Sequence, residues 1–118
     1  MERPMNALGM IELSSIAAGF AVADAMLKAG EVDLLLSRTI CSGKFMILIG
    51  GMVASVRAAV DAGVETADGS VIDHTVIPNL HPSVFPALSG TTAASQLEAL
   101  GVIESFSVVS LIEAADTA

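Results

Sequence analysis

The chain has 118 residues, enough for one ordinary domain and a short additional segment. Its composition is 53% hydrophobic but only 3% aromatic, and 13 acidic against five basic residues give a formal net charge of −8. With so few cations there is no basic stripe for phosphates, and the longest uncharged apolar run, residues 45–56, is shorter than the ~20 residues of a membrane span, so we expect neither nucleic acid nor a membrane as partner.

The mean hydropathy of +0.74 is high for a chain without a membrane span. Its surplus apolar surface predicts burial between subunits, and therefore an oligomer. The first residues contain no secretory signal, and the single cysteine, Cys41, provides no disulfide framework. We therefore expect a protein of the reducing cytoplasm.

The first predicted elements are a strand over residues 7–13 and a helix over residues 16–29. Residues 7–13 form an apolar run of strand length, followed by Ser14 and Ser15 as candidate helix caps. Beyond them, apolar side chains recur three or four positions apart until Gly30 supplies a stop. The expected apolar stripe of the helix consists of Ile16, Phe20, Ala23 and Leu27.

A β-hairpin is predicted next, with strands over residues 32–40 and 44–49. The strands are separated by Cys41, Ser42 and Gly43, small residues that suit a compact turn between antiparallel strands.

A second helix and a last strand complete the unit. Residues 52–67 predict a helix that Asp68 and Gly69 break, and residues 71–77 predict a strand that ends at Pro78, because proline cannot donate to a sheet. The helix carries valines at helical spacing: Val53, Val56, Val60 and Val64. The order β-α-β-β-α-β is that of an α+β, ferredoxin-like fold, with an antiparallel sheet and helices on one face.

The end of the chain repeats its beginning. A shift of 92 residues aligns eight identical residues: Ala7, Leu8, Gly9, Ile11, Glu12, Ser15, Ala23 and Asp24 with Ala99, Leu100, Gly101, Ile103, Glu104, Ser107, Ala115 and Asp116. A period of this length is typical of a duplicated domain. We expect residues 1–90 to be one complete domain, 91–98 a linker, and 99–118 the truncated start of a second domain, with its first strand and part of its first helix.

These residues resemble a known family. ALGMIELSSIAAGFAVADAMLKAGEVDLL, residues 7–35, resembles the start of the bacterial microcompartment (BMC) shell domain, in which ALG-x-[IV]-E and A-x-x-ADAM-x-K recur. RTICSGKFMILIGG, residues 38–51, resembles the pore loop and following strand of that domain, and the likeness continues through VRAAVDAG to VIPNLHPSV, residues 76–84. The duplication, and Cys41 where simple hexameric shell proteins usually have glycine, resemble the trimeric tandem-domain subtype of propanediol-utilisation microcompartments.

The resemblance implies a structural protein of a microcompartment shell in the cytoplasm, not an enzyme. Three chains with two domains each would form a pseudohexameric tile, with other copies and other shell proteins as partners. The matched loop, Ile40, Cys41, Ser42 and Gly43, would line the central pore. Without the resemblance, the sequence favours Cys41 as a small apolar residue buried at a turn, and the resemblance reverses this preference.

A pore cysteine also implies a possible cofactor. A [4Fe-4S] cluster normally needs four thiolates, which one chain cannot supply, whereas three copies of Cys41 on a threefold axis supply three. Such a cluster would suit electron transfer across the shell to a partner. The relatives' loop reads Cys-Pro-Gly-Lys, and here Ser42 replaces the proline that would fix the backbone. Without a cluster, the Ser42 hydroxyl and backbone N–H groups would instead hydrogen-bond small metabolites in transit.

The resemblance assigns three residues to the edge of the tile. Lys28 matches the family's edge lysine, although a cation at a helix C-terminus is also explained by the helix dipole. The family's Ile-Pro-Arg-Pro-His motif reads IPNLH here, so that Asn79 replaces the arginine and His81 matches the histidine. The substitution removes a five-donor cation from the expected contact.

No residue pattern indicates catalysis or a zinc site. His74 and His81 lie seven apart without further ligands at zinc-like spacing, and we expect His74 on the surface of a strand. Eight acidic residues are interpreted mostly as solvated charges: Glu12, Asp24, Glu31, Asp33, Asp61, Glu65, Asp68 and Asp73. Two other functions stay open, a ligand-binding regulatory module on a ferredoxin-like scaffold, which would need basic residues near a cleft, and an independent electron-transfer protein.

Overall fold

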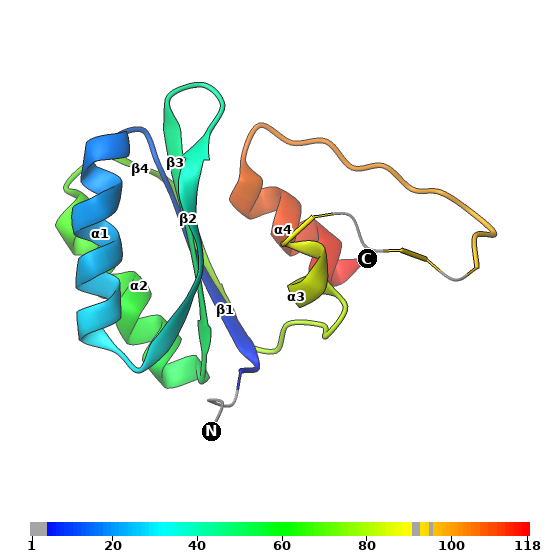
Figure 1. Ribbon diagram of the computed structural model, residues 1–118, viewed down its shortest axis with the longest axis horizontal. Helices are drawn as coiled ribbons and strands as arrows, with labels where there is room; N and C mark the ends of the chain where they lie inside the picture. The colour runs from blue at the N-terminus through cyan, green and yellow to red at the C-terminus, as the bar shows by residue number, and fades with distance from the viewer. Residues whose placement is uncertain (1–4, 91–92, 95) are drawn as a thin grey trace.

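A four-stranded antiparallel sheet organises the chain. The computed structural model describes residues 5–90, 93–94 and 96–118. The strands are β1 (Ala7–Leu13), β2 (Val32–Ile40), β3 (Lys44–Gly51) and β4 (Val71–Ile77), in the spatial order β2-β3-β1-β4. Helices α1 (Ile16–Ala29) and α2 (Val53–Ala67) cover one face of the sheet, as Figure 1 shows. The predicted α+β order and the antiparallel sheet are confirmed.

Helix α1 begins where the sequence predicts, but it buries a different stripe. Ser15 caps the helix, because its hydroxyl accepts a hydrogen bond from the Ala18 amide at 3.2 Å. The predicted stripe of Ile16, Phe20, Ala23 and Leu27 is wrong, since only Ala23 of these is buried. The residues of α1 that face the core are Gly19, Val22, Ala23 and Met26.

Gly19 explains this orientation of α1. A Cβ at that position would lie 2.3 Å from Cδ1 of Phe45, so the helix backbone rests directly on the phenyl ring. Only glycine permits an approach this close, and the contact turns the side of α1 that carries Gly19 toward the sheet. Almost every turn of α1 contains apolar residues, and periodicity alone therefore cannot distinguish the two stripes.

The hairpin and the second helix follow the prediction closely. Strand β3 extends through Gly50 and Gly51, two residues beyond the predicted end, because Gly51 pairs with both Ala7 of β1 and Val32 of β2. In α2 the four predicted valines face the core: Val56 and Val60 are buried, and Val53 and Val64 are partly buried against them. The helix ends at Asp68, which adopts a positive φ of 45°.

The opposite face of the sheet carries a second apolar core. We call this face the open face, because the β-α-β-β-α-β pattern predicts no helix on it. Side chains of β1, β3 and β4 meet α3 (Val84–Ala87) and α4 (Val108–Thr117), which lie across the sheet from α1 and α2 in Figure 1. The buried members of this core are Leu8, Met10, Met46, Leu48, Ile77, Leu80, Val84, Val109 and Ile112. The β-α-β-β-α-β pattern does not predict these two helices.

The second repeat forms its helix without its strand. Ser107 caps α4 by accepting from the Ser110 amide at 3.3 Å, as Ser15 does 92 residues earlier in α1. Residues 99–105, the repeat of β1, are exposed and belong to no sheet in the described part of the chain. A strand needs a partner for its backbone groups, and among the described residues none pairs with this segment. Residues 91, 92 and 95 of the predicted linker lie outside the described residues.

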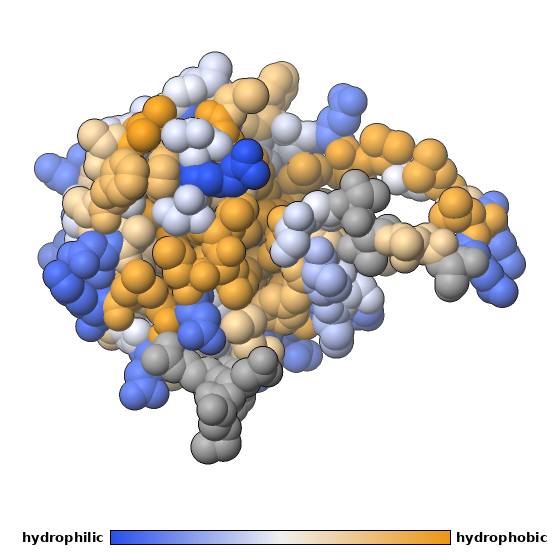
Figure 2. All heavy atoms as spheres, viewed as in Figure 1, coloured by the Kyte–Doolittle hydropathy of each residue, from blue (hydrophilic) through white to orange (hydrophobic). Residues whose placement is uncertain are grey.

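Apolar side chains also gather on the surface. Figure 2 shows them over the middle of the molecule and along the extended segment before α4. The large exposed apolar residues of that segment are Leu97, Leu100, Val102, Ile103 and Phe106. Within the described residues no helix combines the length and apolar character needed to cross a bilayer.

Candidate functional site

Cys41 lies at the free tip of the β2–β3 hairpin. The ladder closes with the pair Ile40 and Lys44, which leaves a turn of three residues whose Gly43 adopts a φ of 78° that favours glycine. Cys41, Ser42 and Gly43 are all exposed, and Cys41 is a free thiol. The tip projects beyond the end of the sheet (Figure 1). The alternative of a cysteine buried at the turn is therefore wrong.

The four predicted pore residues are contiguous, but they differ in their surroundings. Ile40 is half-buried and packs against the core of the open face, which anchors the end of β2. The three residues after it contact solvent, and a Cβ built on Gly43 would meet nothing within 4 Å. The hairpin thus offers a thiol, a hydroxyl and backbone groups to whatever lies beyond the tip.

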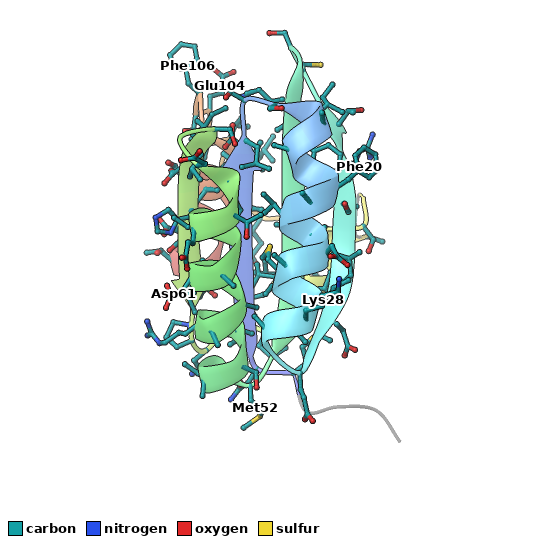
Figure 3. The ribbon with its side chains drawn as sticks, turned by 90° about the vertical axis from the view of Figure 1, so that its left-hand side faces the viewer. Phe20, Lys28, Met52, Asp61, Glu104 and Phe106 are labelled. Carbon is teal, nitrogen blue, oxygen red and sulfur yellow. The ribbon has the colours of Figure 1, made fainter. Side chains whose placement is uncertain are left out.

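The predicted tile-edge residues occupy separate parts of the surface. Lys28 lies in the last turn of α1 (Figure 3). Its ammonium group pairs with the Asp24 carboxylate at 2.7 Å. Asn79 and His81 lie between β4 and α3, and both are exposed. The His81 amide donates to a carboxylate oxygen of Asp116 in α4 at 2.7 Å, and its ring Nδ1 accepts from the Ser83 amide at 3.2 Å. Their assignment to a tile edge stays a prediction.

Glu12 is an exception to the expectation that most of the acidic residues are solvated charges. Glu12 has no exposed surface and lies on the open face in line with Leu8 and Met10. Its carboxylate accepts from the Lys44 ammonium group at 2.7 Å. The pair is well enclosed, since the Lys44 side chain is only 25% exposed.

The second repeat completes the surroundings of Glu12. The Val108 amide donates to Glu12 Oε1 at 3.0 Å, and the Ser107 hydroxyl lies 3.2 Å from the same oxygen and 3.0 Å from the Asp73 carboxylate. A buried carboxylate therefore meets the first turn of α4, where free amides and the helix dipole favour a negative charge. We call Glu12, Lys44, Asp73, Ser107 and Val108 the Glu12 cluster.

One sequence signal pointed to the Glu12 cluster. Glu12 is the only charged residue in a strand whose remaining positions are apolar, and the repeat places Glu104 and Ser107 in the same relation as Glu12 and Ser15. A lone acid in a buried strand requires a partner, because an unpaired charge is costly to bury. The partners themselves could not be identified, since Lys44 lies 32 positions away and the donors of α4 lie 95 and 96 positions away.

The remaining surface carries several hollows that are open to solvent. One of about 190 Å³ lies between β2, β3 and α3, and the residues that line it include no ionisable side chain. Larger ones, of about 620, 360 and 330 Å³, lie at the end of α1, between α3 and α4, and between α2 and β4, and each is lined by ionisable residues. Among the described residues no three of the His, Cys, Asp and Glu side chains are grouped as metal ligands. His74 is exposed on β4, as the sequence predicts.

These features define the class of the protein: an α+β domain of ferredoxin-like order that presents a bare hairpin tip and receives a helix on its open face. Residues 7–80 match the model of the BMC domain, and the chain belongs to this family. The predicted family is thereby confirmed, and with it a place in the shell of a bacterial microcompartment.

Individual relatives agree with this assignment. The chain is 46% identical over 113 residues to the bacterial microcompartment shell protein PduT of Citrobacter freundii, covering 96% of this chain and 61% of that protein. It is 39% identical over 87 residues to the shell protein EutM of Salmonella typhimurium, covering 70% of this chain and 91% of EutM. Both relatives are named as shell proteins, in agreement with the prediction of a structural shell protein rather than an enzyme.

A solved structure has the same fold. A microcompartment protein from Desulfitobacterium hafniense superposes with a TM-score of 0.85 at 49% identity, over 97% of this chain and 63% of that chain. The chain thus spans less than two thirds of the length of both PduT and this solved protein.

Proposed function

We propose that this protein is a subunit of a trimeric, pseudohexameric shell tile in which three hairpin tips gather around a central pore. Residues 99–118 begin the second domain of each subunit, so that three chains supply six domains. The exposed Cys41 at the free end of the β2–β3 hairpin carries the proposal. A thiol at this position is accessible to its symmetry mates, whereas a thiol in the core would not be.

The pore is proposed to hold a [4Fe-4S] cluster through Cys41. The chain fits this cofactor only as one contributor of three, because it has a single cysteine and no further metal ligand is grouped with it in the described residues. Gly43 leaves the surroundings of the tip open, so three tips can approach without a side-chain clash at that position. When bound, the cluster supplies one-electron transfer across the shell to a partner.

The tile is proposed to join other shell proteins along its rim. Lys28 is exposed in the last turn of α1, and Asn79 and His81 are exposed after β4, so all three side chains are available to neighbouring tiles. Because Asn79 offers an amide where the family motif has an arginine, contacts there rely on neutral hydrogen bonds. The similarity to PduT supports a propanediol-utilisation microcompartment as the setting.

Substitution of Cys41 tests the cluster. After anaerobic reconstitution with iron and sulfide, the unmodified protein is expected to bind about four irons per three chains, to show a cluster absorbance and, after reduction with dithionite, to show an EPR signal. Cys41→Ala removes every thiolate and is expected to abolish the iron and both spectra. Ser42→Ala is the matched control, because it alters an exposed neighbour at the same tip without removing sulfur.

Each outcome decides one part of the proposal. Equal iron content in the unmodified protein and in Cys41→Ala would eliminate the cluster, and the tip would then be a conduit for small polar metabolites through Ser42. The tile is tested separately by electron microscopy and sedimentation of the assembled protein. Absence of any threefold or pseudosixfold assembly would contradict the tile.

A further inference from the structure

The end of the β2–β3 hairpin extends beyond the rest of the sheet (Figure 1). Strand β1 pairs with β3 as far as Leu13 and Phe45. Lys44 is therefore the first residue toward the tip whose pairing in the described sheet is with β2 alone, through Ile40. A two-stranded ribbon is only marginally stable by itself. The direction in which Cys41 points therefore depends on what holds the two side chains of this last pair.

The two side chains of this last pair are held in different ways. Ile40 and Lys44 lie opposite each other in the ladder, so both project on the open face. Ile40 packs against the apolar core there. The Lys44 side chain is 25% exposed, and its ammonium group donates to Glu12 Oε2 at 2.7 Å. A lysine next to a turn ordinarily keeps its charge in water, whereas this one directs its charge into the fold.

Glu12 is a fixed anchor for this ammonium group. It has no exposed surface, and its strand is paired on both sides, with Met46 of β3 and Asp73 of β4 opposite Glu12 itself. Its second carboxylate oxygen accepts from the Val108 amide at 3.0 Å. A carboxylate confined in this way cannot follow a partner that moves, so it determines where the lysine lies. The ion pair thus connects the two-stranded end of the hairpin to the middle of the sheet.

We infer that Lys44 is a positioning residue for the pore: its ion pair with Glu12 fixes the base of the hairpin and thereby the direction in which Cys41 presents its thiol. This role rests on the proposed function, in which three tips meet around one opening. A group that three chains share has to be placed by each of them to within about 0.5 Å. Gly43, between the thiol and the lysine, has no side chain to stiffen the turn. The stiffness of the tip therefore comes from its base.

The single cysteine allows a direct measurement, because a nitroxide spin label attached to Cys41 reports the motion of the tip alone. Lys44→Met removes the ion pair but keeps an unbranched side chain, and it is expected to shorten the rotational correlation time of the label by about twofold or more. Lys44→Arg restores the cation and is expected to restore the slower motion. Lys28→Met is the matched control, because it breaks an exposed ion pair of the same length, 2.7 Å, and should leave the label unchanged.

A double variant separates positioning from stability. In Glu12→Gln with Lys44→Met no ion is left without its partner, so at least half of the stability lost in Lys44→Met is expected to return. The ion pair is still absent, and the label is therefore expected to stay as mobile as in Lys44→Met. A purely structural role of the pair would instead make the motion of the label follow the stability. Circular dichroism reports whether each variant is folded under the conditions of the measurement.

Equal motion of the label in the unmodified chain and in folded Lys44→Met would overturn the inference, and so would a double variant that regains the slower motion. These measurements involve no iron, and they are therefore distinct from failure of the proposed function, which is read from Cys41-dependent iron and from the tile itself. Once the cluster is confirmed, Lys44→Met tiles, which keep every thiolate, are expected to acquire iron about twofold or more slowly than Lys28→Met tiles. Equal rates would retain the cluster and remove the role of Lys44.

Discussion

Replacing Lys44 by methionine is expected to lower the free energy of unfolding by about 3–5 kcal/mol. The substitution removes the cation 2.7 Å from the Glu12 carboxylate and leaves that carboxylate fully enclosed. The Val108 amide and the Ser107 hydroxyl remain as donors, but neither carries a charge. Urea denaturation of the unmodified chain and of Lys44→Met measures the difference.

A double-mutant cycle isolates the pair. Glu12→Gln retains an oxygen for the Val108 amide while removing the charge, so Lys44→Met should cost much less in that background than in the unmodified chain. At least half of the lost stability is expected to return in the double variant, because no ion is left without its partner. Additive losses for the two substitutions would mean that the 2.7 Å contact contributes nothing specific.

The strands and helices of the first repeat follow from local pattern and capping. Residues 7–13 and 71–77 are strands with the predicted bounds, and Ser15 and Ser107 cap helices because their hydroxyls reach amides three residues ahead. These features depend on neighbours in sequence. The buried stripe of α1 depends instead on a residue distant in sequence. The ring of Phe45, in strand β3, lies beneath Gly19 and determines which side of the helix faces the sheet.

The Glu12 cluster and the second core depend on contacts across the whole chain. Sequence showed that Glu12 has a repeated counterpart in Glu104, but its burial arises only once α4 folds back over β1. Solvation of an acid in an apolar strand is a reasonable expectation for a sheet with one bare face. The open face is instead covered, and the acid meets a helix start that the sequence had assigned to another domain.

For the proposed pore, the sequence predicts the compact turn, and the fold determines that its thiol is exposed. The turn residues predicted a compact tip, and the fold exposes the thiol of Cys41 at that tip. How chains are arranged around the proposed pore depends on contacts between their surfaces. A single chain contributes only one side of each such contact.

Replacing Phe45 by alanine is expected to cost about 3–5 kcal/mol of unfolding free energy, the range for deleting a buried phenyl ring. Phe45 is buried between the sheet and α1, directly beneath the Gly19 backbone, and its ring centroid lies 5.6 Å from that of Phe20. Its loss leaves a cavity at the point where the helix is closest to the sheet. Thermal and urea unfolding of the 118-residue chain measure the loss.

The effect of Gly19→Ala is expected to change sign with the residue at position 45. With Phe45 present, the new methyl group would lie 2.3 Å from the ring and should destabilise the fold by about 1–3 kcal/mol. With alanine at position 45, the same methyl group enters vacated space, and the better helix propensity of alanine should add up to about 1 kcal/mol of stability. Gly101→Ala serves as the control, since nothing lies within 4 Å of its Cβ position and its effect should be equal in both backgrounds. If Gly19→Ala were equally destabilising with and without the ring, the backbone at Gly19, rather than its contact with Phe45, would set the position of α1.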